Sequence, residues 1–468
     1  MIYDTLYGLD SNLDPKPQMA AGHVISDDGR RIVITLREWL FFHDDARVLA
    51  RDTAASIKRW MVRNPFGQKL ATLSDEVAAL DDSRLEFRLK KPLPLLFSAL
   101  SVIGSACFVM PKRVAATDPF KQLSDTTGSG PFRFLASEFN SGRFVGYTKN
   151  ECYVARDEQA NFTAGDKRVF FDRVEWRIIT DAATSAAALQ YNEIDWFKQP
   201  PPELQELMRR NRNILIEPID TRPTPAMLRL NHLHPPFERK EARQVLLPAI
   251  DKLDFMTATV PADPKGFSTI GAFPPNTPLA SAAGMEVLTG PRSLDRAKSL
   301  LREAGALSPK MRLIGPTDVL VPTAMTQVAW ALFKNLGFNL DFALSDWGTV
   351  IQRRASHEPV DKAGWSALLT AFGSFDWLDP AAHPVLRGNG RDAWFGWPFI
   401  PRLESLHDDW FEAPNLAAQQ AIAADMQRVM LDEVPFIPVG AYFSNTVLRR
   451  DLIGHVSGFA LFHNIKRA

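Results

Sequence analysis

The sequence predicts a mixed α/β protein, because runs with the two-residue period of strands alternate with runs that read as helices. Apolar residues make up 46% of the chain and charged residues 23%, which is the composition of a globular protein. Its 468 residues exceed what one ordinary core holds. Length alone suggests about three domains or subdomains.

Charge and hydropathy exclude several classes of protein. Lysine and arginine together number 54, as do aspartate and glutamate, so the formal net charge is zero. This balance leaves no basic surplus that would indicate nucleic-acid binding. No apolar run approaches the roughly 18 residues of a membrane-spanning helix. The chain opens on residues 2–7, which read as folded domain, and it shows no export signal with a basic start and an apolar centre.

The first half of the chain is predicted to be rich in strands. An Asp-Gly turn between two β-rich runs predicts a hairpin over 22–36. Asp52 is a plausible N-cap for a helix over 53–62. Alternating residues predict a strand over 85–89. Further strands are expected at 132–134, 144–147 and 174–179, followed by a helix over 182–190 with Asp181 as its cap.

The second half alternates strands with longer helices, which predicts a second α/β domain. Gly305 and Gly337 each stand where glycine favours the end of a helix. The expected strands are 227–231, 311–314, 338–344 and 436–439. One helix is expected after Pro236, and three more are expected over 294–304, 323–335 and 415–431.

Two cysteines, Cys107 and Cys152, are too few for a disulfide scaffold. Each lies beside apolar residues, so two buried thiols are the favoured interpretation. A single disulfide is the alternative in an oxidising compartment.

No pattern of residues indicates catalysis, a metal or a cofactor. His43, Asp44 and Asp45 are adjacent and cannot easily converge on one ion, and His232 with His234 make an incomplete zinc site. Gly128-Ser129-Gly130 is followed by a strand rather than a helix, so a dinucleotide loop is excluded.

An aromatic segment is the most distinctive feature of the sequence. Residues 347–399 hold five of the eleven tryptophans, and Asp376 lies within the segment between Phe375 and Trp377. A packed core explains about half of these aromatic residues, and an apolar ligand site would explain the rest. A carboxylate among aromatic rings needs a partner. That partner is a cation of the ligand, an arginine of the protein, or a helix N-terminus.

Segments over nearly the whole chain resemble the solute-binding proteins of peptide/opine/nickel-type ABC importers, the bacterial extracellular solute-binding proteins of family 5. Each segment is short, but their order is specific. They include Ile2-Tyr3-Asp4-Thr5-Leu6, Ser26-Asp27-Asp28-Gly29, Phe42-His43-Asp44, Gly128-Ser129-Gly130-Pro131-Phe132, Asn231 with Pro235-Pro236-Phe237, Arg243-Gln244 to Asp251, and Asp379-Pro380.

The resemblance implies a two-lobed periplasmic-binding-protein fold of class II, with an extra subdomain and a hinge that closes on ligand. Carried onto this chain, the core of lobe I comprises 1–8, 127–222 and 436–468. Residues 9–126 form the extra subdomain, and 223–435 form lobe II.

The resemblance also implies where ligand binds. Asp376 falls where peptide-binding members place the aspartate that meets an amino terminus. The preceding residues 372–375 fall on the strand that hydrogen-bonds a peptide, and Arg353 and Arg354 lie near a position that is sometimes a pocket arginine. The full set of expected ligand-binding residues is Asp376, Phe372, Gly373, Ser374, Phe375, Trp377, Trp347, Arg353, Arg354 and Asn231.

Two departures from the family pattern qualify these expectations. The chain lacks the export signal, first strand and Leu-Asp-Pro segment with which family members begin. Dipeptide binders carry a carboxylate-binding arginine after the strand at 311–314, where this chain reads Gly315-Pro316-Thr317. The missing arginine argues against a peptide whose free carboxylate lies at that depth. The alternatives to a small peptide are a small amine, an opine-like compound or another solute suited to aromatic surroundings.

The expected function is to capture a peptide or amine-bearing solute between two lobes, outside the cytoplasm, and to deliver it to a permease and its ATPase. A monomer with no cofactor and no nucleic-acid partner is expected. The alternatives are an enzyme that uses the same interlobe cleft, which would need a general base near the reacting carbon, and a receptor module that presents ligand to a sensor.

Overall fold

The computed structural model describes residues 1–104, 106–121, 123–259, 267–456, 458 and 461–468. They form two compact units: unit 1 comprises Met1–Ile219 and Asn445–Ala468, and unit 2 comprises Asp220–Ser444. The chain therefore passes between the units twice. The sequence-based boundaries are 222/223 and 435/436, whereas the two units meet in the chain at 219/220 and 444/445. The second boundary differs more, because the strand that follows residue 435 pairs within the sheet of unit 2.

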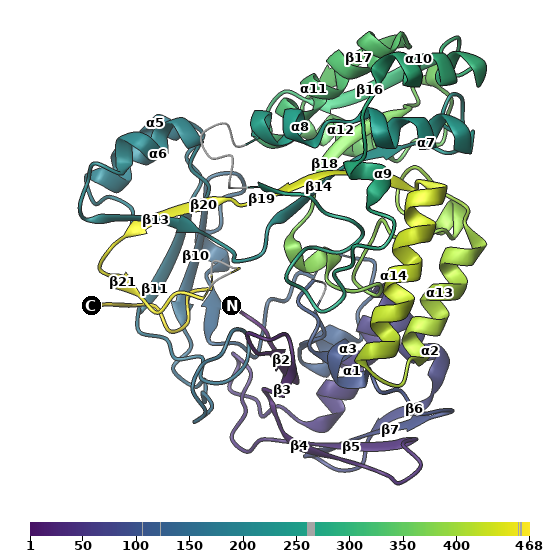
Figure 1. The fold of residues 1–468 in the computed structure, drawn as a ribbon. Coiled ribbons are helices and arrows are strands. Elements are labelled where there is room, and N and C mark those ends of the chain that lie inside the picture. Colours follow the sequence, from purple (N-terminus) through teal and green to yellow (C-terminus); the bar gives the residue numbers. More distant parts are fainter. Residues whose placement is uncertain (105, 122, 260–266, 457, 459–460) are drawn as a thin grey trace. The chain divides into compact units, whose positions relative to one another are not determined.

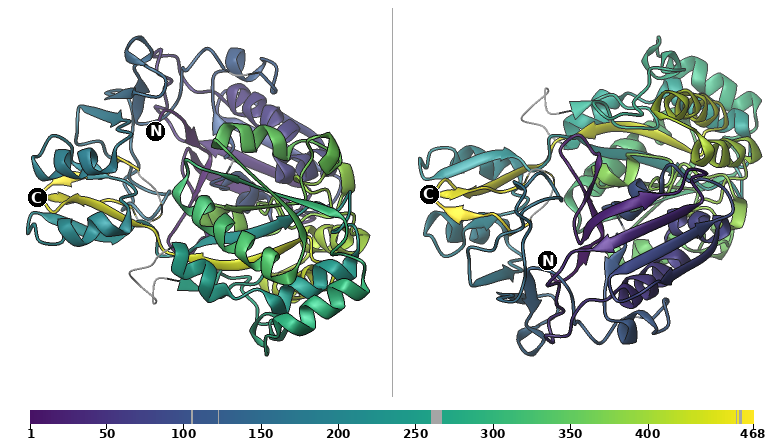
Figure 2. Two further views of the ribbon diagram at one scale, coloured as in Figure 1. Left: turned by 90° about the horizontal axis from the view of Figure 1, so that it is seen from above. Right: turned by 90° about the horizontal axis from the view of Figure 1, so that it is seen from below.

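Unit 1 contains an antiparallel four-stranded sheet of order β4-β5-β7-β6. Every second residue of β5 is buried, as its alternating sequence requires. Two helices pack on one face of this sheet (Figure 2). The strands are β4 (Ala20–Ile25), β5 (Arg31–Leu36), β6 (Ser74–Ala79) and β7 (Arg84–Leu89), and the helices are α1 (Ala50–Arg63) and α2 (Pro65–Leu73). The predicted hairpin and the strand at 85–89 are confirmed.

The predicted cap of α1 is wrong. The helix begins at Ala50, so Asp52 lies in its first turn. Its carboxylate still serves the helix start, because it accepts a hydrogen bond from the Leu49 amide at 3.0 Å. The second oxygen accepts one from the Lys112 amide at 2.8 Å.

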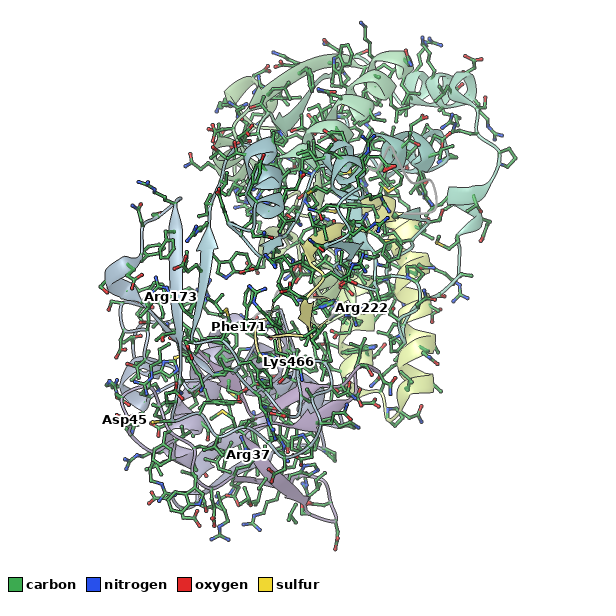
Figure 3. All side chains as sticks on the ribbon, turned by 90° about the vertical axis from the view of Figure 1, so that its left-hand side faces the viewer. Arg37, Asp45, Phe171, Arg173, Arg222 and Lys466 are labelled. Carbon is green, nitrogen blue, oxygen red and sulfur yellow. The ribbon has the colours of Figure 1, made fainter. Side chains whose placement is uncertain are left out.

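A second group of strands in unit 1 precedes the first passage between units. The predicted cap of α5 is confirmed, since the Asp181 carboxylate accepts the Thr184 amide at 2.7 Å. Arg173 lies on β11 (Figure 3). Antiparallel sheets join β9 (Phe132–Phe134), β10 (Phe144–Lys149) and β11 (Arg173–Arg177), and join β12 (Trp196–Phe197), β20 (Asn445–Arg449) and β13 (Ile214–Pro218), with helices α5 (Ala182–Gln190) and α6 (Pro202–Met208).

Short elements complete unit 1. They are β1 (Asp4–Thr5) paired with β8 (Phe108–Val109), β2 (Tyr7–Leu9) paired with β3 (Pro15–Pro17), β21 (Leu452–Ile453) paired with β22 (Lys466–Arg467), the helices α3 (Leu96–Leu100) and α4 (Lys112–Ala115), and the 3-10 turn η1 (Ala136–Glu138).

The Gly128–Gly130 segment packs against the start of the chain. A Cβ atom on Gly128 would lie only 1.6 Å from the carbonyl oxygen of Ile2, so no other residue fits. The ring of His43 spans the same segment, with Nε2 3.1 Å from the Gly130 carbonyl and Nδ1 accepting from the Gly128 amide at 3.1 Å. His43 therefore links its own loop to the backbone of Gly128–Gly130, which packs against Ile2.

The cysteines are both free. Cys107 is buried, as predicted, but Cys152 is exposed, so the expectation of two buried thiols is wrong for Cys152. Cys152 follows the end of β10, and its thiol lies 3.5 Å from the carboxylate of Asp45.

Unit 2 is built on a six-stranded mixed sheet of order β15-β19-β14-β18-β16-β17. The middle strand β14 is antiparallel to both neighbours, and β16 is parallel to β17 and β18. Helix α11 connects β16 to β17 and ends at Gly337, whose φ of 88° suits glycine. The strands are β14 (Thr224–Leu230), β15 (Phe267–Ser268), β16 (Lys310–Pro316), β17 (Asn339–Ser345), β18 (Ala367–Ala371) and β19 (Phe436–Tyr442).

Helices surround this sheet, and α13 and α14 lie side by side (Figure 1). The helices are α7 (Lys240–Ala249), α8 (Lys252–Thr259), α9 (Glu286–Thr289), α10 (Leu294–Glu303), α11 (Leu320–Leu336), α12 (Trp347–Arg354), α13 (Pro401–Glu412) and α14 (Leu416–Glu433), with 3-10 turns η2 (Val360–Lys362), η3 (Ser374–Trp377) and η4 (Gly390–Asp392). The mixed α/β class and the second α/β domain are confirmed.

Candidate functional site

The aromatic segment of unit 2 divides into a buried part and an accessible part. Trp365 and Trp377 are fully buried, and Phe375 and Trp397 nearly so. Partly buried aromatic side chains pack at the edge of this core: Trp347, Trp394 and Phe395. The expectation that about half of the segment is core is therefore confirmed, and these three partly buried rings surround one charged group.

That charged group is the guanidinium of Arg354, in the last turn of α12. Its central carbon lies 4.7 Å from the ring centroid of Phe395, 5.3 Å from that of Trp394 and 6.0 Å from that of Trp347. These distances are those of cation–π contacts. We call Arg354 with these three rings the arginine cage.

Within the described residues, the arginine cage contains no anion. The Nε atom of Arg354 is buried and has no hydrogen-bond partner there. Burial lowers the pKa of the guanidinium, and no carboxylate offsets this effect. A buried donor without a partner is costly. The site is therefore chemically suited to a planar anion such as a carboxylate, which a guanidinium binds through two parallel hydrogen bonds.

Local structure holds the cage in place from two sides. The indole of Trp365 donates a hydrogen bond to the Arg354 carbonyl at 3.0 Å. At the other end of α12, the carboxylate of Asp346 accepts the Thr349 amide at 3.0 Å and caps the helix. The Trp347 amide donates to Asp318 at 2.8 Å.

A second, fully buried arginine supports the loop that carries Trp394 and Phe395. The side chain of Arg229 on β14 donates to the carbonyls of Phe395 and Trp394 at 2.6 and 2.8 Å. It also donates to the carbonyls of Pro435 at 2.8 Å and Val385 at 3.3 Å. Burial lowers its pKa to about 9. This role was not predicted from the sequence, although a lone arginine in the apolar run Met227–Leu230 is a usable signal.

Asp376 lies in the 3-10 turn η3, which follows β18. Burial raises the pKa of its carboxyl, and a backbone hydrogen bond from Gly373 only partly offsets this. Among the described residues its carboxylate has no ion-pair partner, so a protein arginine, one of the three partners considered from sequence, is not seen beside it there. The Gly373 backbone, at the start of η3, is a partner of the helix-terminus kind on the scale of one 3-10 turn. A ligand cation stays a prediction.

The predicted peptide-binding strand ends earlier than expected. β18 stops at Ala371, and Ser374–Trp377 form η3, so the prediction of a strand over 372–375 is wrong. The Phe372 amide donates to the Pro225 carbonyl at 3.0 Å. Gly373 is exposed, and a Cβ there would lie 3.3 Å from Oδ2 of Asp376, so glycine leaves the carboxylate accessible.

The ring of Phe372 packs between Trp394 of the arginine cage and Trp377, the residue that follows Asp376. The ring of Phe372 lies 5.7 Å from that of Trp394 in an edge-on contact and 6.3 Å from that of Trp377. The structure thus brings Phe372, Trp347 and Arg354 into one aromatic cluster on unit 2, with Asp376 beside it in sequence.

Other predicted site residues serve the fold. Both polar groups of the Asn231 side chain bind backbone: Nδ2 donates to the Trp365 carbonyl at 2.9 Å, and Oδ1 accepts the Leu233 amide at 3.0 Å. Trp377 is buried against His383 and Phe436. Arg353 is half-buried and makes none of the ring contacts of Arg354.

The histidines considered for a metal are used within the core or at its edge. His232 is partly buried, and the loss of solvent around its ring lowers its pKa far below the ordinary value. His234 Nε2 lies 2.8 Å from the His357 carbonyl. No group of three metal-ligating side chains occurs in the part of the chain that the structure describes. Nor does any helix of those residues have the length and apolarity to cross a membrane.

Among the described residues, the Arg354 Nε has no hydrogen-bond partner, and the Asp376 carboxylate has no ion-pair partner beyond a backbone hydrogen bond with Gly373. A partly buried guanidinium and a partly buried carboxylate are chemically suited to a ligand that carries both an anionic and a cationic group.

Comparison with known proteins identifies the family of the chain. Residues 14–389 match the model of the bacterial extracellular solute-binding proteins, family 5. A probable peptide ABC transporter periplasmic-binding protein of Sinorhizobium fredii is 33% identical over 474 residues, covering 100% of this chain and 88% of that protein.

Two solved structures share the fold. A Pseudoalteromonas dipeptide-binding protein in complex with Met-Leu aligns with a TM-score of 0.81 at 19% identity, covering 100% of this chain and 94% of the other. AgaA from A. tumefaciens, in complex with agropinic acid, aligns with a TM-score of 0.79 at 18% identity, covering 100% and 93%. At these identities the likeness concerns the two-lobed periplasmic-binding-protein fold alone.

The matched residues span most of the chain, and the S. fredii relative is more than 30% identical over the full length of this chain. The chain therefore belongs to the bacterial extracellular solute-binding proteins of family 5, the substrate-binding subunits of ABC importers.

Proposed function

We propose that this substrate-binding subunit captures a small peptide, or a solute with the same pair of charged ends, in the periplasm and delivers it to a membrane permease with its ATPase. In this proposal Arg354 binds the ligand's carboxylate and Asp376 binds its amino group. The single observation that carries the proposal is the arginine cage, a half-buried guanidinium whose buried Nε has no protein partner among the described residues.

The arginine cage supplies what the family's dipeptide binders obtain elsewhere. This chain has Gly315-Pro316-Thr317 at the end of β16, where those members carry their carboxylate-binding arginine. Arg354 offers the same charge from a different element, the last turn of α12. A carboxylate here would restore the partner that the guanidinium lacks, which is favourable because an unpaired buried charge is costly.

Asp376 supplies the opposite charge. Burial raises the pKa of its carboxyl, and an ammonium group brought beside it would favour the charged form. The S. fredii relative is named for peptides and the Pseudoalteromonas protein was solved with a dipeptide. Both names agree with a ligand that has an amino and a carboxyl terminus.

A binding role is favoured over catalysis because the cluster presents fixed charges and rings without a nucleophile beside a general base. Asp376, the nearest candidate base, has no histidine, serine or cysteine as a hydrogen-bond partner among the described residues. The prediction is reversible binding without turnover, in a monomer that uses no cofactor.

A thermal-shift screen tests the proposal. Trialanine, Met-Leu, agropinic acid, a simple amine and Ni²⁺ with L-histidine would each be added at millimolar concentration, since binding to the folded state raises the melting temperature by mass action. The proposal predicts a shift with trialanine or Met-Leu and a smaller or no shift with the amine. A shift only with the nickel chelate, or with none of these solutes, contradicts it.

A further inference from the structure

The carboxylate of Asp220 joins the turn that carries Asp376 to the first passage between the units. Its Oδ2 accepts the hydroxyl of Ser374 at 2.5 Å. Its Oδ1 accepts the backbone amide and the Nε of Arg222 at 2.9 and 3.1 Å. Asp220 is the first residue of unit 2 after the chain leaves unit 1, and Ser374 precedes Asp376 by two positions.

A second contact from the same segment reaches the residue next to Asp376. The guanidinium carbon of Arg222 lies 4.2 Å from the ring centroid of Phe375, close enough for a strong cation–π contact. The side chains of Arg222 and Asp220 are each only 11% exposed, so solvent weakens their ion pair little. Figure 3 labels Arg222. We call Asp220, Arg222, Ser374 and Phe375 the crossover clamp.

The crossover clamp adds contacts from residues 220 and 222 to a single 3-10 turn. Within η3 the Asp376 amide donates to the Gly373 carbonyl at 3.0 Å, and the Gly373 backbone hydrogen-bonds the Asp376 carboxylate. 3-10 turns have weaker hydrogen-bond geometry than α-helices. Ser374 and Phe375, the two residues before Asp376, are buried and contact Asp220 and Arg222. The position of the turn that carries the Asp376 carboxylate therefore depends in part on contacts made by residues 220 and 222.

We propose that Asp220 and Arg222 are positioning residues for Asp376 and act through Ser374 and Phe375. In this proposal they couple ligand binding at Asp376 to the backbone of residues 220–224, the crossover segment at the first passage between the units. This inference rests on the proposed function, because it takes Asp376 as a ligand-binding residue. The same buried contacts of Asp220 and Arg222 hold both the η3 turn and residues 220–224, so a change in one segment alters the other.

The first test needs no ligand. Hydrogen–deuterium exchange would follow the backbone amides of 373–377 and of 220–224 in the wild-type chain and in Ser374→Ala. Losing the hydrogen bond to a charged acceptor should speed exchange in both segments by about tenfold. Ser374→Thr, which keeps the hydroxyl, should restore slow exchange.

Ser366→Ala is the matched control. Ser366 is as buried as Ser374, and its hydroxyl accepts the Arg312 amide at 3.1 Å, away from the crossover segment. It should leave exchange at 220–224 unchanged. Unchanged exchange at 373–377 or at 220–224 in Ser374→Ala, or equal effects of the control, overturns the inference.

The second test asks whether the clamp acts through Asp376. The affinity for trialanine would be measured for the wild-type chain, Ser374→Ala, Asp376→Asn and the double variant. Ser374→Ala should weaken binding about tenfold in the wild-type background and have little effect once Asp376 is Asn. An equal loss in both backgrounds overturns the positioning role while leaving the proposed function intact.

Failure of the proposed function looks different. If trialanine binds neither the wild-type chain nor Asp376→Asn, while exchange responds at both segments as expected, the peptide assignment fails and the crossover clamp stands. Asp220→Asn gives an independent check by exchange, because it keeps an acceptor for Ser374 but removes the charge that pairs with Arg222. It should give a smaller increase in exchange than Ser374→Ala at 373–377.

Discussion

The guanidinium carbon of Arg354 lies 5.3 Å from the ring centroid of Trp394, and that of Arg229 lies 5.4 Å from the same ring. One indole thus contacts two cations. They differ in what else they bind: Arg229 donates to four backbone carbonyls, whereas the Nε of Arg354 has no partner within the described residues. Arg229 therefore holds the loop of Trp394 and Phe395, and Arg354 keeps the donor that the proposed function assigns to a ligand.

Replacing Arg354 should weaken binding of peptides with a free carboxyl terminus. Arg354→Gln removes a charge-assisted contact of about 1.5–3 kcal/mol, which is roughly a 10- to 100-fold loss of affinity. Isothermal titration calorimetry with trialanine and with its C-terminal amide measures the affinity of each chain for each peptide. The amide should bind the wild-type chain and Arg354→Gln equally weakly.

Arg353→Gln is the matched control for that experiment, since Arg353 is the adjacent arginine on α12 and contacts none of the three rings. It should change the affinity by less than about threefold. A larger loss in Arg353→Gln than in Arg354→Gln would contradict the assignment of Arg354.

Binding of an amine-bearing ligand should fail in acid at a higher pH than an ordinary aspartate would require. Burial raises the pKa of Asp376 above 3.8, and an ammonium ligand binds its charged form. Affinity should therefore be constant above that raised pKa and fall as the pH drops through it, with protons released on binding in that window. Titration calorimetry in buffers of different ionisation enthalpy measures the release.

Asp376→Asn should remove this acid limb and bind more weakly at neutral pH. A control peptide with an acetylated amino terminus should show no acid limb with either chain. An acid limb that persists in Asp376→Asn would show that another group controls the ligand's amine.

Arg229→Met should destabilise unit 2 strongly. The substitution leaves the carbonyls of Phe395, Trp394, Pro435 and Val385 without their buried donor, at a cost of about 3–5 kcal/mol of unfolding free energy. Urea unfolding followed by tryptophan fluorescence measures the loss. Arg229→Lys keeps the charge but satisfies fewer carbonyls, so its loss should be smaller, and equal losses would contradict this account.

The buried His383 should make unit 2 less stable as the pH falls. Leu386 donates its amide to Nδ1 at 3.2 Å, so the ring is neutral with its proton on Nε2, 2.9 Å from the Ala272 carbonyl. Burial lowers the pKa of His383 from 6.5 to about 3. Because the unfolded chain takes up the proton first, the stability that His383 contributes is complete above pH 6.5 and is lost as the pH falls toward 3.

Urea unfolding at pH 7 and pH 5 tests this. The unfolding free energy of the wild-type chain should fall toward that of His383→Gln by about 2 kcal/mol over this interval. A difference between the two chains that does not change with pH would contradict a neutral, buried His383.

Sequence patterns predicted the regular elements well where the local signal was strong. The helix over 182–190 has its capping aspartate, and α11 ends at a glycine with positive φ. The start of α1 was misplaced because the capping residue is Leu49, which carries no capping signal, while the carboxylate of Asp52 works from inside the first turn.

The candidate site was only partly predictable. Arg354 and Asp376 were named from sequence, but nothing local indicates that one arginine of the Arg353-Arg354 pair enters a ring of aromatic side chains. Asn231 was expected at the ligand and instead binds backbone, because an amide on a buried strand end must satisfy its hydrogen bonds within the protein. The contacts of Asp220 with Ser374 join residues 154 positions apart, a separation that no local pattern encodes.

The most direct measurement is isothermal titration of the wild-type chain with trialanine and with acetyl-trialanine amide, a pair that differs only in the two terminal charges. We predict that trialanine binds and that the capped peptide binds at least about 100-fold more weakly, since it offers neither a carboxylate to Arg354 nor an ammonium to Asp376. Equal affinity for the two peptides would contradict the account.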